Sequence, residues 1–195
     1  MLIYGYPIGI YKLPSHKKLK EEFLPHLSND EMFSKVPHWQ SNVETTFGSD
    51  TNNLLPWDTF IKESIGLLKE YINDFLNLNR IDFNIGTYAW LNRYRTGQYQ
   101  EIHNHAGNNN AISCAYMLST PIDSGNFVFY NEGSDFWNNT PLREFTNNYP
   151  FNNRFTPNMS EGDIIFFPST LSHYVTFNNS TDVRSTISAN FKINT

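Results

Sequence analysis

The chain has 195 residues, one cysteine (Cys114) and a net charge of −5, from 14 Lys and Arg against 19 Asp and Glu. This composition excludes an intramolecular disulfide and an all-cysteine metal site, and it argues against electrostatically driven binding of nucleic acid. Aromatic residues make up 16% of the chain and 26 residues are Asn, which favours a β-rich fold with elaborate loops.

Residues 1–13 are predicted to form an extended entry segment, and residues 1–11 lack the basic start of a secretory signal. No apolar stretch approaches the roughly 20 residues that a membrane-spanning helix needs. We therefore expect a cytoplasmic protein that makes no contact with a membrane.

Helices are predicted in the first part of the chain. Ser15 is expected to cap a short helix that Pro25 stops, and Ser28 with Glu31 has the spacing of a capping box. The clearest helix runs over residues 56–76, where apolar residues recur at helical period along one stripe. We expect this stripe to pack against a sheet.

From residue 82 onward the pattern changes to short apolar segments separated by Gly, Asn, Pro or Asp. Strands are predicted at Thr87–Tyr94, Gln98–His105, Ile112–Leu118, Asn126–Tyr130, Asp163–Phe167, His173–Phe177 and Arg184–Phe191. Many short strands with turn signals are typical of a sandwich, jelly roll or barrel. The length fits one domain over residues 1–195, with 1–81 as extended and helical support and 82–195 as the β core.

Residues 131–158 interrupt the β region without a strand pattern, and several of them are aromatic. Long insertions are uncommon in compact domains unless they have a function. Two interpretations are open: a lid over a pocket, or a loop that is packed by its own aromatic side chains.

Two of the six histidines, His103 and His105, lie two residues apart in a predicted strand. Side chains two apart in a strand point to the same face, so both imidazoles can bind one cation at roughly 2.1 Å. By itself a His-x-His pair is a weak signal. We expect His16 and His26 to lie on the surface.

The second half of the chain adds two further candidates. His173 follows the strand that ends at Pro168, and Arg184 comes eleven residues after His173. Arg184, Thr186 and Ser188 share one strand face. A cation on the inner face of a closed sheet needs an anionic partner, and the guanidinium fork suits a carboxylate. That partner is either a ligand or an internal Asp or Glu.

In chain order, the His103–His105 pair, His173 and Arg184 resemble the motifs of the iron(II)- and 2-oxoglutarate-dependent dioxygenases. Those enzymes use a His-x-Asp/Glu pair, a distal His and a later Arg. The similarity covers about half of the chain, residues 90–191. The segments at 90–97 and 162–169, with the His pair and the Arg184 strand, more narrowly resemble small oxygenases common in marine bacteriophage genomes. The resemblance implies a mainly β (α+β) fold, a double-stranded β-helix (jelly roll, cupin-like) with the N-terminal helices packed outside it.

The resemblance also implies iron(II) and 2-oxoglutarate as cofactors, with O2 as a co-substrate. His103 would be the proximal metal ligand and His173 the distal one. Arg184 would bind the far carboxylate of 2-oxoglutarate, assisted by Thr186. The remaining candidates for lining the cofactor pocket, on neighbouring predicted strands, are Tyr94, Asn92 and Tyr116.

The chain departs from this resemblance at His105, which takes the position of the usual carboxylate of the two-histidine-one-carboxylate site. Three interpretations are open for the third ligand. In the first, His105 binds the metal and gives a three-histidine metal site. In the second, Glu101 on the same strand face supplies the carboxylate; in the third, water or an anion is the ligand and His105 lies next to it without binding the metal.

The expected reaction couples decarboxylation of 2-oxoglutarate to succinate with hydroxylation of an unidentified substrate. By analogy with related folds we favour an amino-acid side chain, free or in a protein. Two other functions are open: a cupin-like metal enzyme that does not use 2-oxoglutarate, and a non-catalytic jelly-roll module that binds a ligand or belongs to a virion. The oligomeric state is also open.

Overall fold

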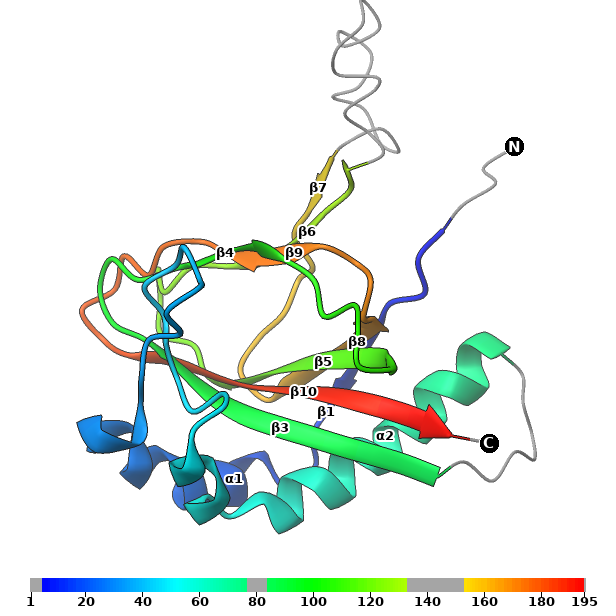
Figure 1. The fold of residues 1–195 in the computed structure, drawn as a ribbon, viewed down its shortest axis with the longest axis horizontal. Coiled ribbons are helices and arrows are strands. Elements are labelled where there is room, and N and C mark those ends of the chain that lie inside the picture. Colours follow the sequence, from blue (N-terminus) through cyan, green and yellow to red (C-terminus); the bar gives the residue numbers. More distant parts are fainter. Residues whose placement is uncertain (1–4, 77–83, 133–152, 195) are drawn as a thin grey trace, which may run out of the picture.

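The computed structural model describes residues 5–76, 84–132 and 153–194 (Figure 1). Their strands form two sheets, and all of the described strand pairs are antiparallel. The six-stranded sheet has the order β1 (Gly9–Lys12), β8 (Asp163–Pro168), β5 (Asn110–Ser119), β10 (Arg184–Asn194), β3 (Asn84–Tyr94) and β2 (Glu44–Thr45). The four-stranded sheet has the order β4 (Gln100–His103), β9 (His173–Val175), β6 (Phe127–Tyr130) and β7 (Arg154–Phe155).

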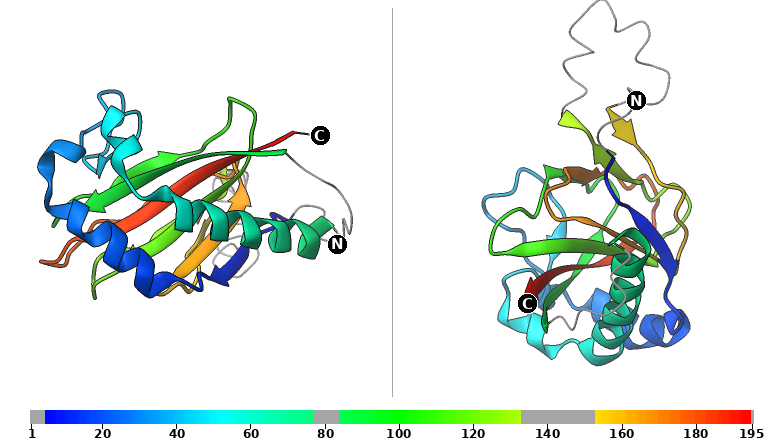
Figure 2. Two further views of the ribbon diagram at one scale, coloured as in Figure 1. Left: turned by 90° about the horizontal axis from the view of Figure 1, so that it is seen from below. Right: turned by 90° about the vertical axis from the view of Figure 1, so that its right-hand side faces the viewer.

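The helices lie against the outer face of the six-stranded sheet, and the four-stranded sheet faces its other side (Figures 1 and 2). The helical segments are α1 (His16–Phe23), α2 (Trp57–Leu76) and the 3-10 turns Leu24–Ser28, Asp30–Met32 and Asp50–Leu54. This arrangement confirms the predicted mainly β class with N-terminal helices outside. No helix in the described ranges is both long enough and apolar enough to span a bilayer.

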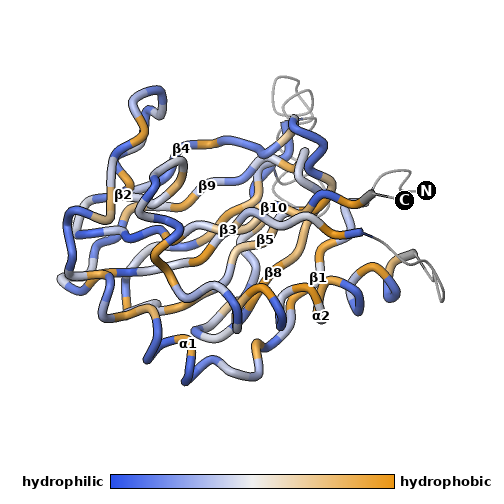
Figure 3. Tube along the Cα trace, turned by 60° about the horizontal axis from the view of Figure 1, so that its bottom comes forward, coloured by the Kyte–Doolittle hydropathy of each residue, from blue (hydrophilic) through white to orange (hydrophobic). Residues whose placement is uncertain are grey.

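Apolar side chains form two buried clusters, one on each face of the six-stranded sheet. The outer cluster joins the sheet to the helices through residues such as Phe23, Phe60, Leu68 and Phe166. The inner cluster lies between the two sheets. Figure 3 shows hydrophobic segments along β8 and α2, while connecting loops are mostly hydrophilic.

Strand β5 contributes alternate residues to both clusters. Cys114, Tyr116 and Leu118 belong to the outer cluster, and Ala115 and Met117 to the inner one. This follows from the two-residue period of a strand that is buried on both faces. As a result, β5 separates the helix-facing core from the space between the sheets.

The expected helix caps are wrong in detail. Ser15 precedes α1 but makes no capping bond there, because its hydroxyl donates to Glu63 on α2. The next cap is Asn29 rather than Ser28: the Asn29 side chain accepts from the Glu31 amide, whereas the Ser28 hydroxyl bonds the Pro25 carbonyl at 3.1 Å. In both cases the serine side chain bonds a group other than the helix amide that the sequence spacing predicts.

Most of the aromatic insertion, residues 133–152, lies outside the described residues, so its predicted role as a lid or a packed loop stays a prediction. Its described end is not structureless. Arg154 and Phe155 form β7, which pairs with Tyr130 and Phe129 of β6.

Gly125 occupies a backbone position that no other residue fits. Its φ is +84°, and a Cβ there would lie 2.5 Å from the Thr176 carbonyl oxygen and 2.7 Å from that of Phe177. We expect Gly125→Ala to lower the free energy of unfolding by about 3 kcal/mol or more, because steric conflict adds to backbone strain. Urea unfolding measures this loss.

Gly97→Ala is the matched control, because Gly97 has a φ of +78° but nothing within 4 Å of its Cβ position. It should cost only the strain of the positive φ, about 1 kcal/mol. Equal losses in the two variants would contradict the proposed close approach at Gly125.

Candidate metal centre

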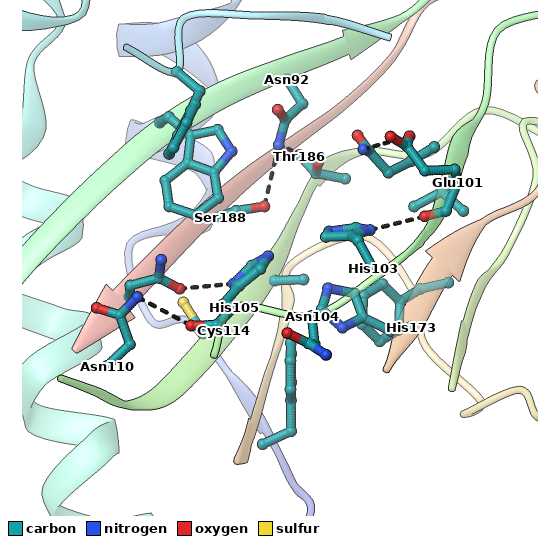
Figure 4. Close-up of a pocket in the computed structure, with 18 of the residues that line it drawn as sticks. Asn92, Glu101, His103, Asn104, His105, Asn110, Cys114, His173, Thr186 and Ser188 are labelled. Carbon is teal, nitrogen blue, oxygen red and sulfur yellow. Dashed lines mark hydrogen bonds between the residues drawn. The ribbon is translucent and has the colours of Figure 1, made fainter. Parts of the chain in front are cut away.

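Three histidines converge in the space between the two sheets. His103 of β4 and His173 of β9 are direct cross-strand partners, and His105 follows β4 by two residues. Each offers one ring nitrogen, and these three atoms all lie within 4.8 Å of one another. The rings converge in Figure 4, with centroids 4.4 to 5.2 Å apart. Such a spacing suits a single metal ion.

Two of these imidazoles are oriented by backbone carbonyls. His103 Nδ1 lies 2.8 Å from the Glu101 carbonyl oxygen, and His173 Nδ1 lies 2.9 Å from that of Leu171. Because a carbonyl oxygen can only accept, both Nδ1 atoms carry the proton. Each Nε2 is therefore left with a lone pair, which is the arrangement that metal-binding histidines use.

The third imidazole is oriented by an asparagine. His105 Nδ1 lies 2.7 Å from Asn190 Oδ1, which also accepts from the Ser113 hydroxyl at 2.8 Å. Ser113 is in turn 2.8 Å from the Ser169 hydroxyl, and the Ser169 carbonyl accepts from the His105 amide at 2.8 Å. His105 is thus held through both its ring and its backbone, with Nε2 free.

Burial lowers the pKa of all three histidines. The pKa of His105 falls to about 4, and those of His103 and His173 also fall below the ordinary value. Proximity to His103 lowers the pKa of the other two further. The imidazoles are therefore neutral near pH 7, the state in which histidine binds metals.

Glu101 lies beside this cluster but not in it. Its carboxylate oxygens accept from the Gln40 amide and from Gln100 Nε2, each at 3.0 Å. Of the three ligand sets left open by the sequence, the geometry favours the set of three histidines.

A cavity of about 260 Å³ opens over the three rings. Trp39, Phe47 and Trp90 form an aromatic wall beside the histidines: Trp39 stacks 6.4 Å from His103, and Trp90 lies 5.5 Å from His105. Phe47 bridges the two tryptophans at 5.7 and 5.0 Å. The opposite wall carries polar groups from β3 and β10, including Asn92, Thr186 and Ser188.

The expected cofactor-binding residues form cross-strand pairs on the inner face of the larger sheet. Arg184 pairs with Tyr94, and Thr186 pairs with Asn92. Asn92 Nδ2 donates to Ser188 at 3.1 Å, while its Oδ1 is buried with no partner in the part of the chain that the structure describes. Burial raises the pKa of Tyr94 to about 12, so its hydroxyl stays protonated.

Arg184 is buried, with 2% of its surface exposed, and its Nε has no hydrogen-bond partner among the described residues. Its other nitrogens donate to the Gly125 carbonyl and, at 3.3 Å, to Met117 Sδ. No Asp or Glu of the described chain lies within ion-pair distance, so the internal salt bridge considered above is not formed there. A buried guanidinium without an acid is costly, and a bound anion would relieve that cost.

Arg184 does not line the cavity over the histidines. It borders a neighbouring polar cavity of about 250 Å³, and Met117 and Phe127 line both cavities. These two side chains therefore stand between the guanidinium and the metal cluster.

Tyr116 is not brought to the site, and the expectation that it lines the pocket is wrong. It lies on the outer face of β5, packs against Phe60 and bonds His16 Nδ1 at 2.6 Å. The same contact makes His16 half-buried rather than a surface residue.

Sequence reasoning missed Asn190, Ser113 and Trp39. Asn190 continues the face of Arg184, Thr186 and Ser188 by one more two-residue step, so the strand period could have found it. Ser113 pairs with Asn190 across β5 and β10. Trp39 lies in a loop far from the histidines in sequence, and no periodic pattern marked it.

Asn190→Ala should weaken binding of a divalent metal by about 10- to 100-fold, the usual loss when a group that orients a histidine ligand is removed. Titration with Co(II), followed by visible absorption, measures this. Asn190→Asp should retain most of the affinity because it keeps the acceptor, and Asn179→Ala, at an exposed position, should bind as the wild type does. Unchanged affinity in Asn190→Ala would contradict the orienting role.

Comparison with known families now identifies the chain. Residues 88–190 match the family described as "Putative 2OG-Fe(II) oxygenase", a span that runs from within β3 to within β10. The chain belongs to this family. The protein is accordingly a 2-oxoglutarate-dependent non-haem iron oxygenase, with iron(II) and 2-oxoglutarate as its cofactors. This excludes the cupin-like and non-catalytic alternatives.

Solved structures share the fold of this oxygenase at low sequence identity. A prolyl-4-hydroxylase from Pseudomonas putida aligns with a TM-score of 0.63 and 13% identity, over 96% of this chain and 92% of that one. A viral collagen prolyl hydroxylase from Paramecium bursaria Chlorella virus-1 aligns at 0.54 and 15%, over 96% of both chains. HygX from Streptomyces hygroscopicus, solved with nickel and 2-oxoglutarate, aligns at 0.56 and 13%, over 96% and 83%.

These likenesses confirm the predicted jelly-roll fold of the oxygenase. No match was found among curated protein sequences. The closer resemblance to bacteriophage oxygenases stays a prediction.

Proposed function

We propose that His103, His105 and His173 together hold the iron(II) of this oxygenase. The supporting observation is that three neutral imidazoles, each with its Nδ1 proton bound elsewhere, direct their free Nε2 atoms into one cavity. Imidazole nitrogen is a suitable ligand for iron(II), so the residues present fit the metal.

We further propose that Arg184 binds the far carboxylate of 2-oxoglutarate, with Thr186 and Tyr94 beside it and Asn92 in the same wall. The buried guanidinium with an unpaired Nε supports this assignment. A carboxylate would take the place of the Met117 thioether, a weak acceptor, at the guanidinium. Met117 and Phe127 must then shift to join the two cavities.

When bound, iron(II) and 2-oxoglutarate supply the oxidising chemistry with O2, and 2-oxoglutarate leaves as succinate and CO2. The protein's own residues orient the metal ligands and exclude water from the cavity. Asn190 and the Leu171 carbonyl fix two of the imidazoles, and the wall of Trp39, Phe47 and Trp90 keeps one side of the cavity apolar. One domain over residues 1–195 would carry the whole site.

The proposed substrate is an amino-acid side chain, free or in a protein, which enters past the aromatic wall and is hydroxylated. Support comes from the fold that the chain shares with two solved prolyl hydroxylases. Asn104 and Asn108, both exposed at the cavity, are available to bind peptide groups.

The test is to load the protein with iron(II) and 2-oxoglutarate without oxygen, admit air, and measure succinate. Succinate formation that depends on both iron and O2 is expected even without the substrate, at a slow uncoupled rate. Failure of the metal-loaded protein to bind 2-oxoglutarate would refute the proposal.

A further inference from the structure

We propose that Glu101 supplies, from outside the ligand set, the negative charge that a ligating carboxylate supplies in the two-histidine-one-carboxylate site. This inference rests on the proposed three-histidine iron site. It assigns Glu101 as a positioning residue that acts on the metal through its charge and not through a bond.

Glu101 lies at the same cavity as the three histidines, next to His103 (Figure 4). Its backbone carbonyl accepts from His103 Nδ1, so the residue is tied to the first ligand. Its two carboxylate oxygens are held by neutral donors, the Gln40 amide and Gln100 Nε2. Within the described residues, no Lys, Arg or His nitrogen lies within ion-pair distance of it. Its charge is fixed in place and is not neutralised by a protein cation.

Among the residues that the structure describes, Glu101 is the one acidic residue lining this cavity, and no Lys or Arg of those residues lines it. Three neutral histidines leave the +2 charge of iron(II) intact. With 2-oxoglutarate at −2 and Arg184 at +1, the loaded site would carry +1, and Glu101 brings it to zero. An unbalanced charge in a partly buried site is unfavourable, so this balance stabilises the loaded state.

The charge of Glu101 also acts across the cavity on Tyr94, the cross-strand partner of Arg184. Burial raises the pKa of the Tyr94 hydroxyl, and the Glu101 charge adds to that increase. Glu101 therefore influences a residue beside the proposed 2-oxoglutarate partner.

The test is Glu101→Gln, which keeps the shape and removes the charge. Because Coulomb energy scales with ion charge, the variant should lose more affinity for iron(III) than for iron(II). The logarithm of the fold-loss for iron(III) should be about 3/2 of that for iron(II). The Fe(III)/Fe(II) reduction potential, from a mediated redox titration, should move to more positive values. We expect iron(II) itself to bind about 10-fold more weakly.

The controls separate charge from structure. Glu101→Asp keeps the charge and should keep the potential near that of the wild type. Glu70→Gln removes an equal charge from an exposed position on α2, across the sheet, and should leave the potential unchanged. Gln40→Lys adds a cation at an exposed residue next to the carboxylate and should raise the potential in a chain with Glu101 intact.

An unchanged potential in both Glu101→Gln and Gln40→Lys, with metal bound, would overturn the charge role of Glu101 while leaving the iron site standing. A purely structural role would weaken both oxidation states alike and leave the potential where it was. Wild-type protein that binds no metal at the histidines would overturn both this inference and the proposed function.

Discussion

A variant with both His103→Ala and His173→Ala is expected to retain no iron and to form no succinate. These residues are direct cross-strand partners, so the substitution removes two of the three imidazoles from one point of the site. His105 alone cannot hold a divalent ion against water, because one imidazole gives little chelation. The measurements are metal content after anaerobic loading and succinate formed after air is admitted.

His38→Ala is the matched control, since it removes an imidazole from an exposed position. It should load iron and form succinate as the wild type does. Circular dichroism checks that the double variant is folded, because the His173 ring packs against Phe127 and Phe167 of the inner cluster and its removal takes away those contacts. Full metal content in the folded double variant would contradict the site.

Arg184→Met is expected to weaken 2-oxoglutarate binding by about 100-fold or more. Removing one partner of a buried, hydrogen-bonded charge pair costs roughly 3 kcal/mol or more, and Arg184 is the proposed partner of the far carboxylate. Without ligand, the variant should unfold no more easily than the wild type. The reason is that Arg184 is buried with no acid beside it, and methionine removes that desolvation cost.

Calorimetric titration of the metal-loaded protein with 2-oxoglutarate, together with thermal unfolding, checks both parts. Arg184→Lys should recover part of the affinity because it keeps the charge but loses the fork. Lys192→Ala, on the same strand at an exposed position, should bind 2-oxoglutarate normally. Unchanged 2-oxoglutarate affinity in Arg184→Met would place the cofactor elsewhere.

The sequence predicted those elements whose signal is local. The strands at β3, β8, β9 and β10 begin or end near Gly, Asn and Pro, and α2 has an unbroken apolar stripe. The face of Arg184 and Thr186 followed from a two-residue period that β10 preserves. The predicted strand over 98–105 is shorter in the structure: β4 ends at His103, and His105 reaches the site from the residues that follow the strand.

The misplaced residue Tyr116 has a physical reason. Both faces of β5 are buried, so its residues are apolar on either side and alternation does not tell the inner face from the outer. The separation of Arg184 from the metal cavity depends on how Met117 and Phe127 pack, which no sequence pattern specifies. Trp39 reaches the site because of the conformation of its loop, which no sequence pattern specifies either.

The most direct measurement is a crystal structure of the protein loaded without oxygen with iron(II) and 2-oxoglutarate, with anomalous scattering to locate the iron. We predict one iron peak roughly 2.1 Å from the Nε2 atoms of His103, His105 and His173. We also predict the far carboxylate of 2-oxoglutarate paired with the Arg184 guanidinium, and Glu101 near the iron but not bound to it. An iron peak bonded to a Glu101 oxygen, or 2-oxoglutarate away from Arg184, would contradict this account.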